Sequence, residues 1–276
     1  RKRQNLLFSA TWNEKVQQVS EDFLLSPTVI RINPEVKTVK SVSQVVYFTP
    51  NLRTKINLLD HFIKDEKYRK MIIFCKTKTT ATNIYKYLDR KYGEESVRVV
   101  HGNKDQNTRI NAIKLFKEEK IRFLVATDVA ARGIDIEDVS HVFNFEVPLV
   151  YEDYIHRIGR TGRAQKIGDS ITFCAPNDEY HLKKIQKLIG DKIPVAQIPV
   201  EVEILPTPYE EEQVMRRQID DQRKREDPEF QGAFHDKKGF QHSKKGDVPK
   251  NKVKGKNKKK AKAIARSKEI RKDKSK

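Results

Sequence analysis

A regular alternation of short apolar runs with longer amphipathic stretches constrains the fold of this chain most. The apolar runs predict strands over residues 29–32, 45–48, 71–75, 97–100, 123–126, 141–145 and 170–174. Helical patterns fill most of the gaps, over residues 55–63, 79–91, 106–118, 150–158 and 179–189. Strands that alternate with such helices indicate βαβ units, so we expect an α/β fold with a parallel sheet covered by helices on both faces.

Positive charge collects at the carboxyl end of the chain. Residues 237–276 hold eighteen Lys or Arg against three acids, and so contribute fifteen of the net charge of +19. This segment has few large apolar residues and cannot bury enough surface to offset the entropy of ordering. We expect a disordered tail that binds RNA without sequence preference; a merely solvated tail and a nuclear or nucleolar address are the alternatives.

The two cysteines predict the redox setting. Cys75 and Cys174 each end an apolar run and belong to no metal-spaced pair, so we expect two buried thiols, no disulfide and no zinc site. This pattern favours a reducing, cytoplasmic compartment. The sequence contains no run of eighteen apolar residues and no signal-peptide pattern, so no membrane segment is expected.

A basic motif near residue 160 predicts phosphate binding. From Tyr154 to Arg163 the chain reads Tyr-Ile-His-Arg-Ile-Gly-Arg-Thr-Gly-Arg, which places His156, Arg157 and Arg160 within one short segment. Guanidinium groups stay charged at any working pH and match phosphate oxygens in pairs. The alternative is an exposed basic turn that is only solvated.

Two other segments accompany this motif. Residues 125–136 read Val-Ala-Thr-Asp-Val-Ala-Ala-Arg-Gly-Ile-Asp-Ile, and residues 8–11 read Phe-Ser-Ala-Thr. In their order along the chain, the three segments resemble motifs of the DEAD-box RNA helicases. The apolar run at 71–75, the His101-Gly102 pair and the Gln106/Arg109 pair resemble the remaining motifs of that family's carboxyl half. The resemblance covers roughly residues 1–190, and the combination is far more specific than any single match.

The resemblance implies a RecA-like fold and a division of the chain into four parts. These are the end of a preceding helicase domain with its linker (1–35), the carboxyl-terminal RecA-like domain (36–193), a charged extension (194–227) and the lysine-rich tail (228–276). A G-x-x-x-x-G-K-[S/T] loop and an Asp-Glu-Ala-Asp run do not occur in the sequence. The chain also begins at Arg1 without a methionine, so we expect it to be part of a longer protein.

The same resemblance implies an ATP site shared with an amino-terminal RecA-like domain. Arg160 and Arg163 would be arginine fingers, Asp135 would bind the ribose hydroxyls, and Gly133 belongs to the same ATP-binding element. Magnesium would be held by the other domain, and no metal ligand is expected in this chain. A catalytic and coupling role is implied for His156, which would link the ATP site to Ser9 and Thr11. Arg157 would serve structure or interdomain contact.

RNA contacts are expected where the strands end, because ligands of parallel sheets gather at the carboxyl edge. The resemblance implies contacts to the RNA backbone from six residues: Thr77, Gly102, Gln106, Arg109, Thr127 and Asp128. Plainer alternatives exist for two pairs. Thr127 or Asp128 would cap the short turn that follows, with Gly133 ending it, and Gln106 with Arg109 would be an exposed helical pair.

The resulting hypothesis is the carboxyl-terminal half of an ATP-dependent RNA helicase, inactive alone, which remodels short RNA duplexes when ATP and RNA close the two domains. RNA and the amino-terminal domain are the expected partners of a monomer. One alternative is a non-enzymatic RNA-binding or annealing protein with a degenerate helicase scaffold. Another is a related superfamily 2 DNA translocase.

Overall fold

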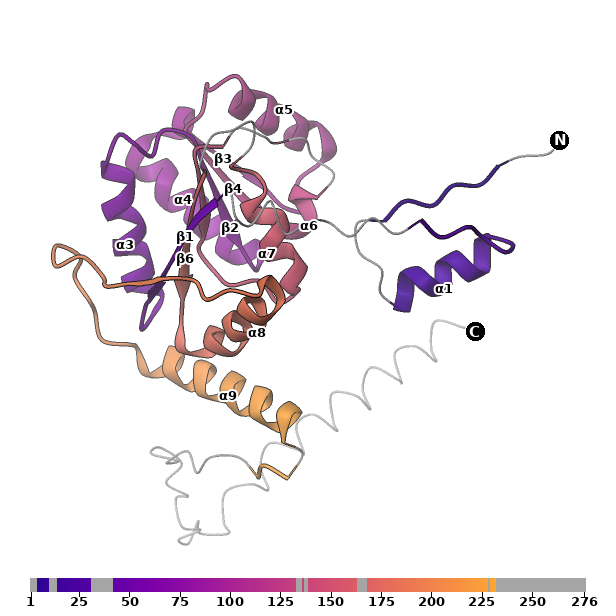
Figure 1. The fold of residues 1–276 in the computed structure, drawn as a ribbon. Coiled ribbons are helices and arrows are strands. Elements are labelled where there is room, and N and C mark those ends of the chain that lie inside the picture. Colours follow the sequence, from indigo (N-terminus) through magenta and orange to yellow (C-terminus); the bar gives the residue numbers. More distant parts are fainter. Residues whose placement is uncertain are drawn as a thin grey trace, which may run out of the picture. The chain divides into compact units, whose positions relative to one another are not determined.

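A computed structural model describes residues 4–9, 14–30, 42–132, 136, 139–162, 168–227 and 229–231 of the chain. Its centre is a seven-stranded sheet in the order β3-β4-β2-β5-β6-β1-β7 (Figure 1), in which every paired strand is parallel to its neighbour. The strands are β1 (Val42–Phe48), β2 (Met71–Cys75), β3 (Val97–Val100), β4 (Phe123–Thr127), β5 (His141–Asn144), β6 (Gly168–Cys174) and β7 (Val195–Ala196).

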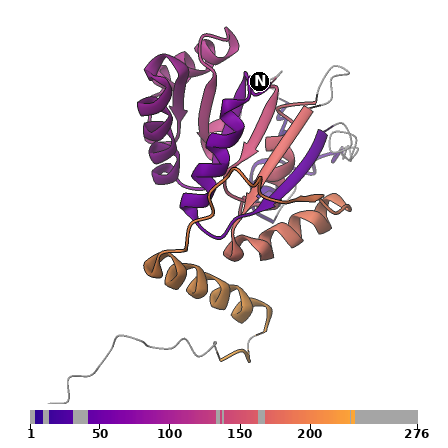
Figure 2. The same cartoon turned by 90° about the vertical axis from the view of Figure 1, so that its left-hand side faces the viewer.

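Helices cover both faces of this sheet, as the views in Figures 1 and 2 show. One face packs against α3 (Leu52–Lys64) and α4 (Lys78–Tyr92); the other packs against α5 (Gln106–Lys117), α6 (Asp128–Ala131), α7 (Tyr151–Ile158) and α8 (Glu179–Ile189). The sheet needs cover on both faces because its strands are apolar on both sides, and the side chains of β2 alternate between the two helical layers. Ile73 joins the cluster under α3 and α4, whereas Ile72 and Phe74 join the cluster under α5. The predicted α/β fold is therefore confirmed.

Polar side chains fix where the helices begin. Asn51 accepts a hydrogen bond from the Thr54 N–H at 2.8 Å at the start of α3, and Asp105 accepts one from the Thr108 N–H at 2.9 Å at the start of α5. Helix α8 ends at Gly190, whose φ of 73° lies in the left-handed region that glycine adopts without strain.

Most predicted elements agree with the structure to within a few residues, but one predicted strand is wrong. Residues 29 and 30 form no strand, and residues 31 and 32 lie outside the described part of the chain. The helix α1 (Glu14–Phe23), the two-residue edge strand β7 and the short 3-10 helices η1 (Glu94–Ser96) and η2 (Pro176–Asp178) were not predicted. The thiols of Cys75 and Cys174 are buried and unpaired, as expected.

The charged extension returns to the domain, a point that the sequence left open. It forms the helix α9 (Tyr209–Glu226) after an irregular stretch. Asn51 donates to the Leu205 carbonyl at 2.6 Å, and Glu211 of α9 accepts from the Leu52 N–H at 2.7 Å. Val202 is buried in the core beside α3.

Two expectations concern parts of the chain about which the structure says little. The lysine-rich tail from residue 232 onward lies outside the described residues, so its disorder stays a prediction. Among the helices that are described, none has the length and apolar character needed to cross a membrane.

Candidate functional site

Three of the predicted RNA-binding turns lie at adjacent strand ends. Cys75 of β2 is opposite Thr127 of β4, and β3 lies on the other side of β4. Thr77, Gly102 and Thr127 therefore leave neighbouring strands at the carboxyl edge, where helix amino termini present unpaired amides. The structure thus brings together three residues that are far apart in sequence.

The local geometry of these turns differs. Thr77 is exposed and caps α4, since its hydroxyl oxygen accepts from the Thr80 N–H at 3.0 Å. Thr127 precedes α6 and is buried, but its side chain makes no capping hydrogen bond. The plainer alternative of capping is therefore not found for Thr127, and the Asp128 carboxylate accepts hydrogen bonds from Arg157.

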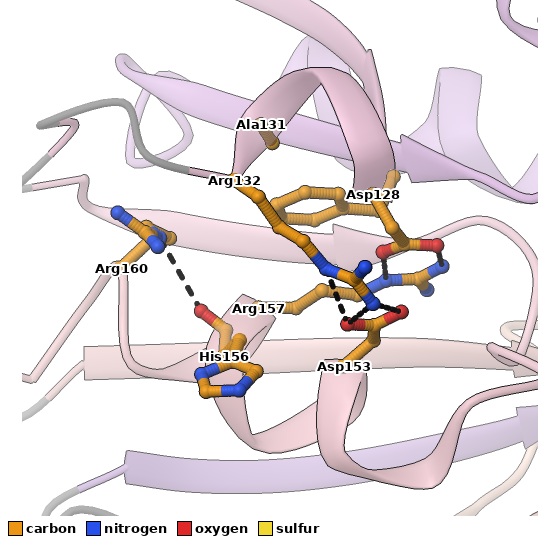
Figure 3. Close-up of a pocket in the computed structure, with 8 residues that line it drawn as sticks. Asp128, Ala131, Arg132, Asp153, His156, Arg157 and Arg160 are labelled. Atoms are coloured by element: carbon orange, nitrogen blue, oxygen red, sulfur yellow. Dashed lines mark hydrogen bonds and ion pairs between the residues drawn. The ribbon is translucent and has the colours of Figure 1, made fainter. Parts of the chain in front are cut away.

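Arg157 joins three elements beneath this edge (Figure 3). Its Nε and Nη2 donate to the two carboxylate oxygens of Asp128 at 2.6 and 2.8 Å. Its Nη1 donates to the Glu146 carbonyl at 2.7 Å and to Asn144 Oδ1 at 3.2 Å. The side chain is 1% exposed and lies over the Phe74 ring. With four of its five N–H groups bonded and its side chain buried, the guanidinium holds α6 and α7 against the end of β5 and is not accessible to a phosphate.

A second arginine–carboxylate pair, which the sequence did not reveal, lies beside the first. Arg132 donates through Nε to Asp153 Oδ1 at 3.1 Å and through Nη2 to Oδ2 at 2.7 Å. Asp153 is buried on α7, whereas Arg132 is half exposed. In the sequence, Asp153 is recognisable only as an acid in the first turn of a short helix. That position does not predict its pairing with an arginine 21 residues away.

Arg160 and His156 are placed on the outer side of these pairs. Arg160 is partly exposed, and its Nε donates to the His156 carbonyl at 3.3 Å (Figure 3). The His156 side chain is exposed at the end of α7. The cavity between Arg160, Arg132 and Asp153 encloses about 20 Å³, room for about one water. A nucleotide would therefore meet Arg160 from outside this cavity.

Gln106 and Arg109 lie together on the first turns of α5. Arg109 donates to Gln106 Oε1 at 3.0 Å and to the Ala130 carbonyl at 3.1 Å, so it ties α5 to α6. The Nε of Arg109 is buried and has no hydrogen-bond partner in the described structure. The pair is therefore partly committed to the fold, and its predicted contact with RNA stays a prediction.

Several predicted site residues cannot be placed. Thr11, Gly133, Asp135 and Arg163 lie outside the described residues. Ser9 is exposed in the stretch before α1, and its coupling to His156 stays a prediction. Among the described residues, no group of three or more His, Cys, Asp or Glu side chains is placed to hold a metal ion.

Comparison with known proteins identifies the relatives of this chain. Residues 54–165 match the family model of the helicase conserved C-terminal domain. The ATP-dependent RNA helicase RhlB of Shewanella woodyi is 40% identical over 194 residues, which are 70% of this chain and 43% of that protein. The chain thus spans less than half the length of this relative.

Solved structures of DEAD-box proteins are also similar to this chain. The E. coli DEAD-box protein SrmB, solved bound to regulator of ribonuclease activity A, is 36% identical, with a TM-score of 0.55 over 60% of this chain and 97% of its own. The C-terminal domain of the DEAD-box protein Dbp5 is 31% identical, with a TM-score of 0.53 over 65% of this chain and 99% of its own. S. cerevisiae Dbp5 bound to RNA and ADP BeF3 is 28% identical, with a TM-score of 0.60 over 77% of this chain and 54% of its own.

Proposed function

The chain belongs to the DEAD-box family as its carboxyl-terminal helicase domain, and on that premise we propose that it is one half of an ATP-dependent RNA helicase. The relative RhlB carries that activity in its name, and this chain covers 43% of its length. An amino-terminal RecA-like domain of the same protein is the proposed partner. The proposal also includes a monomeric state and a cytoplasmic location, the latter in keeping with two unpaired thiols.

The observation that carries the proposal is a row of three residues at the carboxyl edge of the sheet. Thr77 and Gly102 follow β2 and β3, and Thr127 ends β4 between them, so the turns after three neighbouring strands lie side by side. Such a row suits the backbone of a single RNA strand, which carries a phosphate at each step. Arg160 follows α7, and its carbonyl accepts a hydrogen bond from the Val139 N–H, two residues before β5 begins and so toward the opposite edge of the sheet.

The structure is compatible with ATP, which the family implies. Arg160 is partly exposed, whereas neighbouring Arg157 is buried against Asp128, so a phosphate can reach Arg160 but not Arg157. When bound, ATP would supply the phosphoryl group that is transferred to water. Arg160 and Arg163 would stabilise the charge that develops there, an effect typically worth on the order of 10³ to 10⁵ in rate.

Other residues of this chain would bind and couple the ligands. Asp135 would accept hydrogen bonds from the ribose hydroxyls and Gly133 would lie beside the nucleotide. Magnesium would be held by the amino-terminal domain. His156 would transmit the state of the ATP site to Ser9 and Thr11. Because ATP and RNA would both bind across the two domains, each should tighten the binding of the other and favour closure, which strains a short duplex and parts it.

The test is ATP hydrolysis by the longer protein, with and without RNA. RNA-stimulated hydrolysis is expected, and Arg160→Ala should lower it at least a thousandfold without loss of folding. Arg90→Ala, an exposed arginine on α4, is the matched control and should leave it unchanged. The isolated 276-residue chain should hydrolyse no ATP. Tight RNA binding without any hydrolysis by the longer protein would instead support a non-enzymatic annealing protein.

A further inference from the structure

The turn after β3 is tied to the start of α4 by a continuous chain of hydrogen bonds through the buried His101. The Asn103 N–H donates to His101 Nδ1 at 3.3 Å. On the other side of the ring, His101 Nε2 lies 3.1 Å from the Thr82 hydroxyl, which donates its own proton to the Lys78 carbonyl at 2.8 Å. Because that proton is already used, the Thr82 oxygen must accept from Nε2–H.

These contacts define the protonation state of His101. The ring is neutral, with its proton on Nε2 and an acceptor at Nδ1. Burial lowers the pKa of His101, and the positive charges of Lys104 and Lys78 lower it further. A neutral ring at pH 7 therefore fits both the hydrogen bonds and the surrounding charge.

The chain of hydrogen bonds leads to the ammonium group of Lys78. Lys78 Nζ donates to Asn103 Oδ1 at 2.7 Å on the exposed surface. A Cβ added to Gly102 would lie 3.4 Å from Lys78 Cε and 3.5 Å from Nζ, so the lysine lies against the Gly102 backbone. Within the described residues, no carboxylate forms an ion pair with this ammonium. Two of its three N–H groups are left for another acceptor.

We propose that Lys78 is a further RNA phosphate contact of this surface, and that His101 is a positioning residue that holds Lys78 and the Gly102 turn together. The proposal rests on the proposed function and adds two residues to its RNA surface. Lys78 begins α4 directly after Thr77, and Gly102 leaves a strand two places away in the sheet. A phosphate near both would meet the ammonium and the amides at the start of α4.

The first test compares Lys78→Gln with Lys86→Gln, an exposed lysine on the same helix. The 276-residue chain is titrated with a short single-stranded oligoribonucleotide at several salt concentrations. Lys78→Gln should weaken binding about fivefold at 0.1 M salt and reduce the slope of log K against log salt by about 0.7, one phosphate contact. Lys86→Gln should change neither, and the lysine-rich tail is common to all variants. Equal behaviour of the two variants would overturn the proposal.

The second test asks whether His101 acts through Lys78. His101→Ala should weaken RNA binding to a similar extent, and the double variant His101→Ala with Lys78→Gln should be no weaker than either single variant. His101→Asn should recover part of the affinity, since its Oδ1 can accept from the Asn103 N–H. Additive losses would show that His101 does not act through Lys78. If His101→Ala does not fold, His101→Asn replaces it in the comparison with Lys78→Gln and the double variant, and the same test of additivity applies.

A third measurement is independent of the tail. Hydrogen exchange should show that RNA protects residues 101–105 in the unmodified chain and much less so in Lys78→Gln, and equal protection would contradict the proposal. The outcomes also separate this inference from the proposed function. If Lys78→Gln weakens RNA binding but the longer protein shows no RNA-stimulated ATP hydrolysis, the helicase proposal fails and the RNA surface stands. If the longer protein hydrolyses ATP but Lys78→Gln binds RNA normally, the helicase proposal stands and the role of Lys78 is refuted.

Discussion

Arg157 is a charged side chain that lies almost entirely inside the protein. Burial of a guanidinium is costly unless its donors are satisfied, and here four hydrogen bonds to three residues satisfy them. Neighbouring Arg132 makes a similar pair with Asp153, but its own side chain is 53% exposed. The two arginines therefore differ mainly in burial, which makes them a matched pair for measurement.

Arg157→Ala should destabilise the fold by about 3 kcal/mol, since it leaves the carboxylate of Asp128 and the Glu146 carbonyl without their partner. Arg132→Ala should cost less, about 2 kcal/mol, because it leaves the buried Asp153 carboxylate without its partner but leaves no other acceptor unpaired. Urea denaturation of both variants measures the difference. Equal losses would mean that the burial of Arg157 and its bonds to Asn144 and Glu146 add nothing to its contribution.

The start of β6 lies very close to the end of the basic motif. A Cβ on Gly168 would come closer than 3.0 Å to the Thr161 hydroxyl and to the Gly162 amide nitrogen, so only glycine fits there. Gly162 itself has a φ of 72°, in the left-handed region. The first residue of β6 therefore fixes the turn that directly follows Arg160.

Gly168→Ala should accordingly displace this turn and impair ATP hydrolysis by the longer protein at least tenfold, together with a stability loss of about 1–3 kcal/mol. Gly190→Ala is the control, because it also strains the backbone, at a φ of 73°, but has open space for a Cβ and ends α8. It should cost about 1 kcal/mol and leave hydrolysis unchanged. If both variants hydrolyse ATP at the same rate, the turn is not held by Gly168.

The elements themselves were predictable to different degrees for physical reasons. Strand β2 and helix α8 were predicted to the residue, because buried parallel strands are continuous apolar runs and because Gly190 ends the helix. Helix α1 was missed, and residues 29 and 30 were mistaken for a strand, although their side chains are exposed. A short apolar run such as this one does not by itself predict a strand, because strand formation also depends on pairing with a neighbouring strand.

The site was less predictable than the fold. The spacing of arginines and glycines indicated phosphate binding, but it could not separate the buried Arg157 from the accessible Arg160. That separation depends on Asp128, which binds Arg157 from 29 residues away along the chain. Pairings at such distances follow from the order of the strands, which the sequence pattern does not specify.

At the scale of the whole molecule, three buried histidines make stability depend on pH. Burial lowers the pKa of His101, His141 and His181, which lie after β3, in β5 and in α8. Each is therefore harder to protonate in the folded than in the unfolded chain. Above a pH of about 6.5, the ordinary value for histidine, both states are neutral and these groups contribute no pH dependence.

As the pH falls below that value, the unfolded chain takes up protons that the folded chain does not, so the free energy of unfolding should decrease. The loss should begin near pH 6.5 and continue until the pH reaches the lowered pKa values of the folded state. Urea denaturation at pH 7.5, 6.5 and 5.5 measures it, in a range where carboxylates stay ionised. His181→Gln, which removes one titrating group but keeps a polar side chain between Tyr151 and Gln222, should show a smaller decrease. A stability that is constant or rises between pH 7.5 and 5.5 would contradict the assignment of three neutral, buried rings.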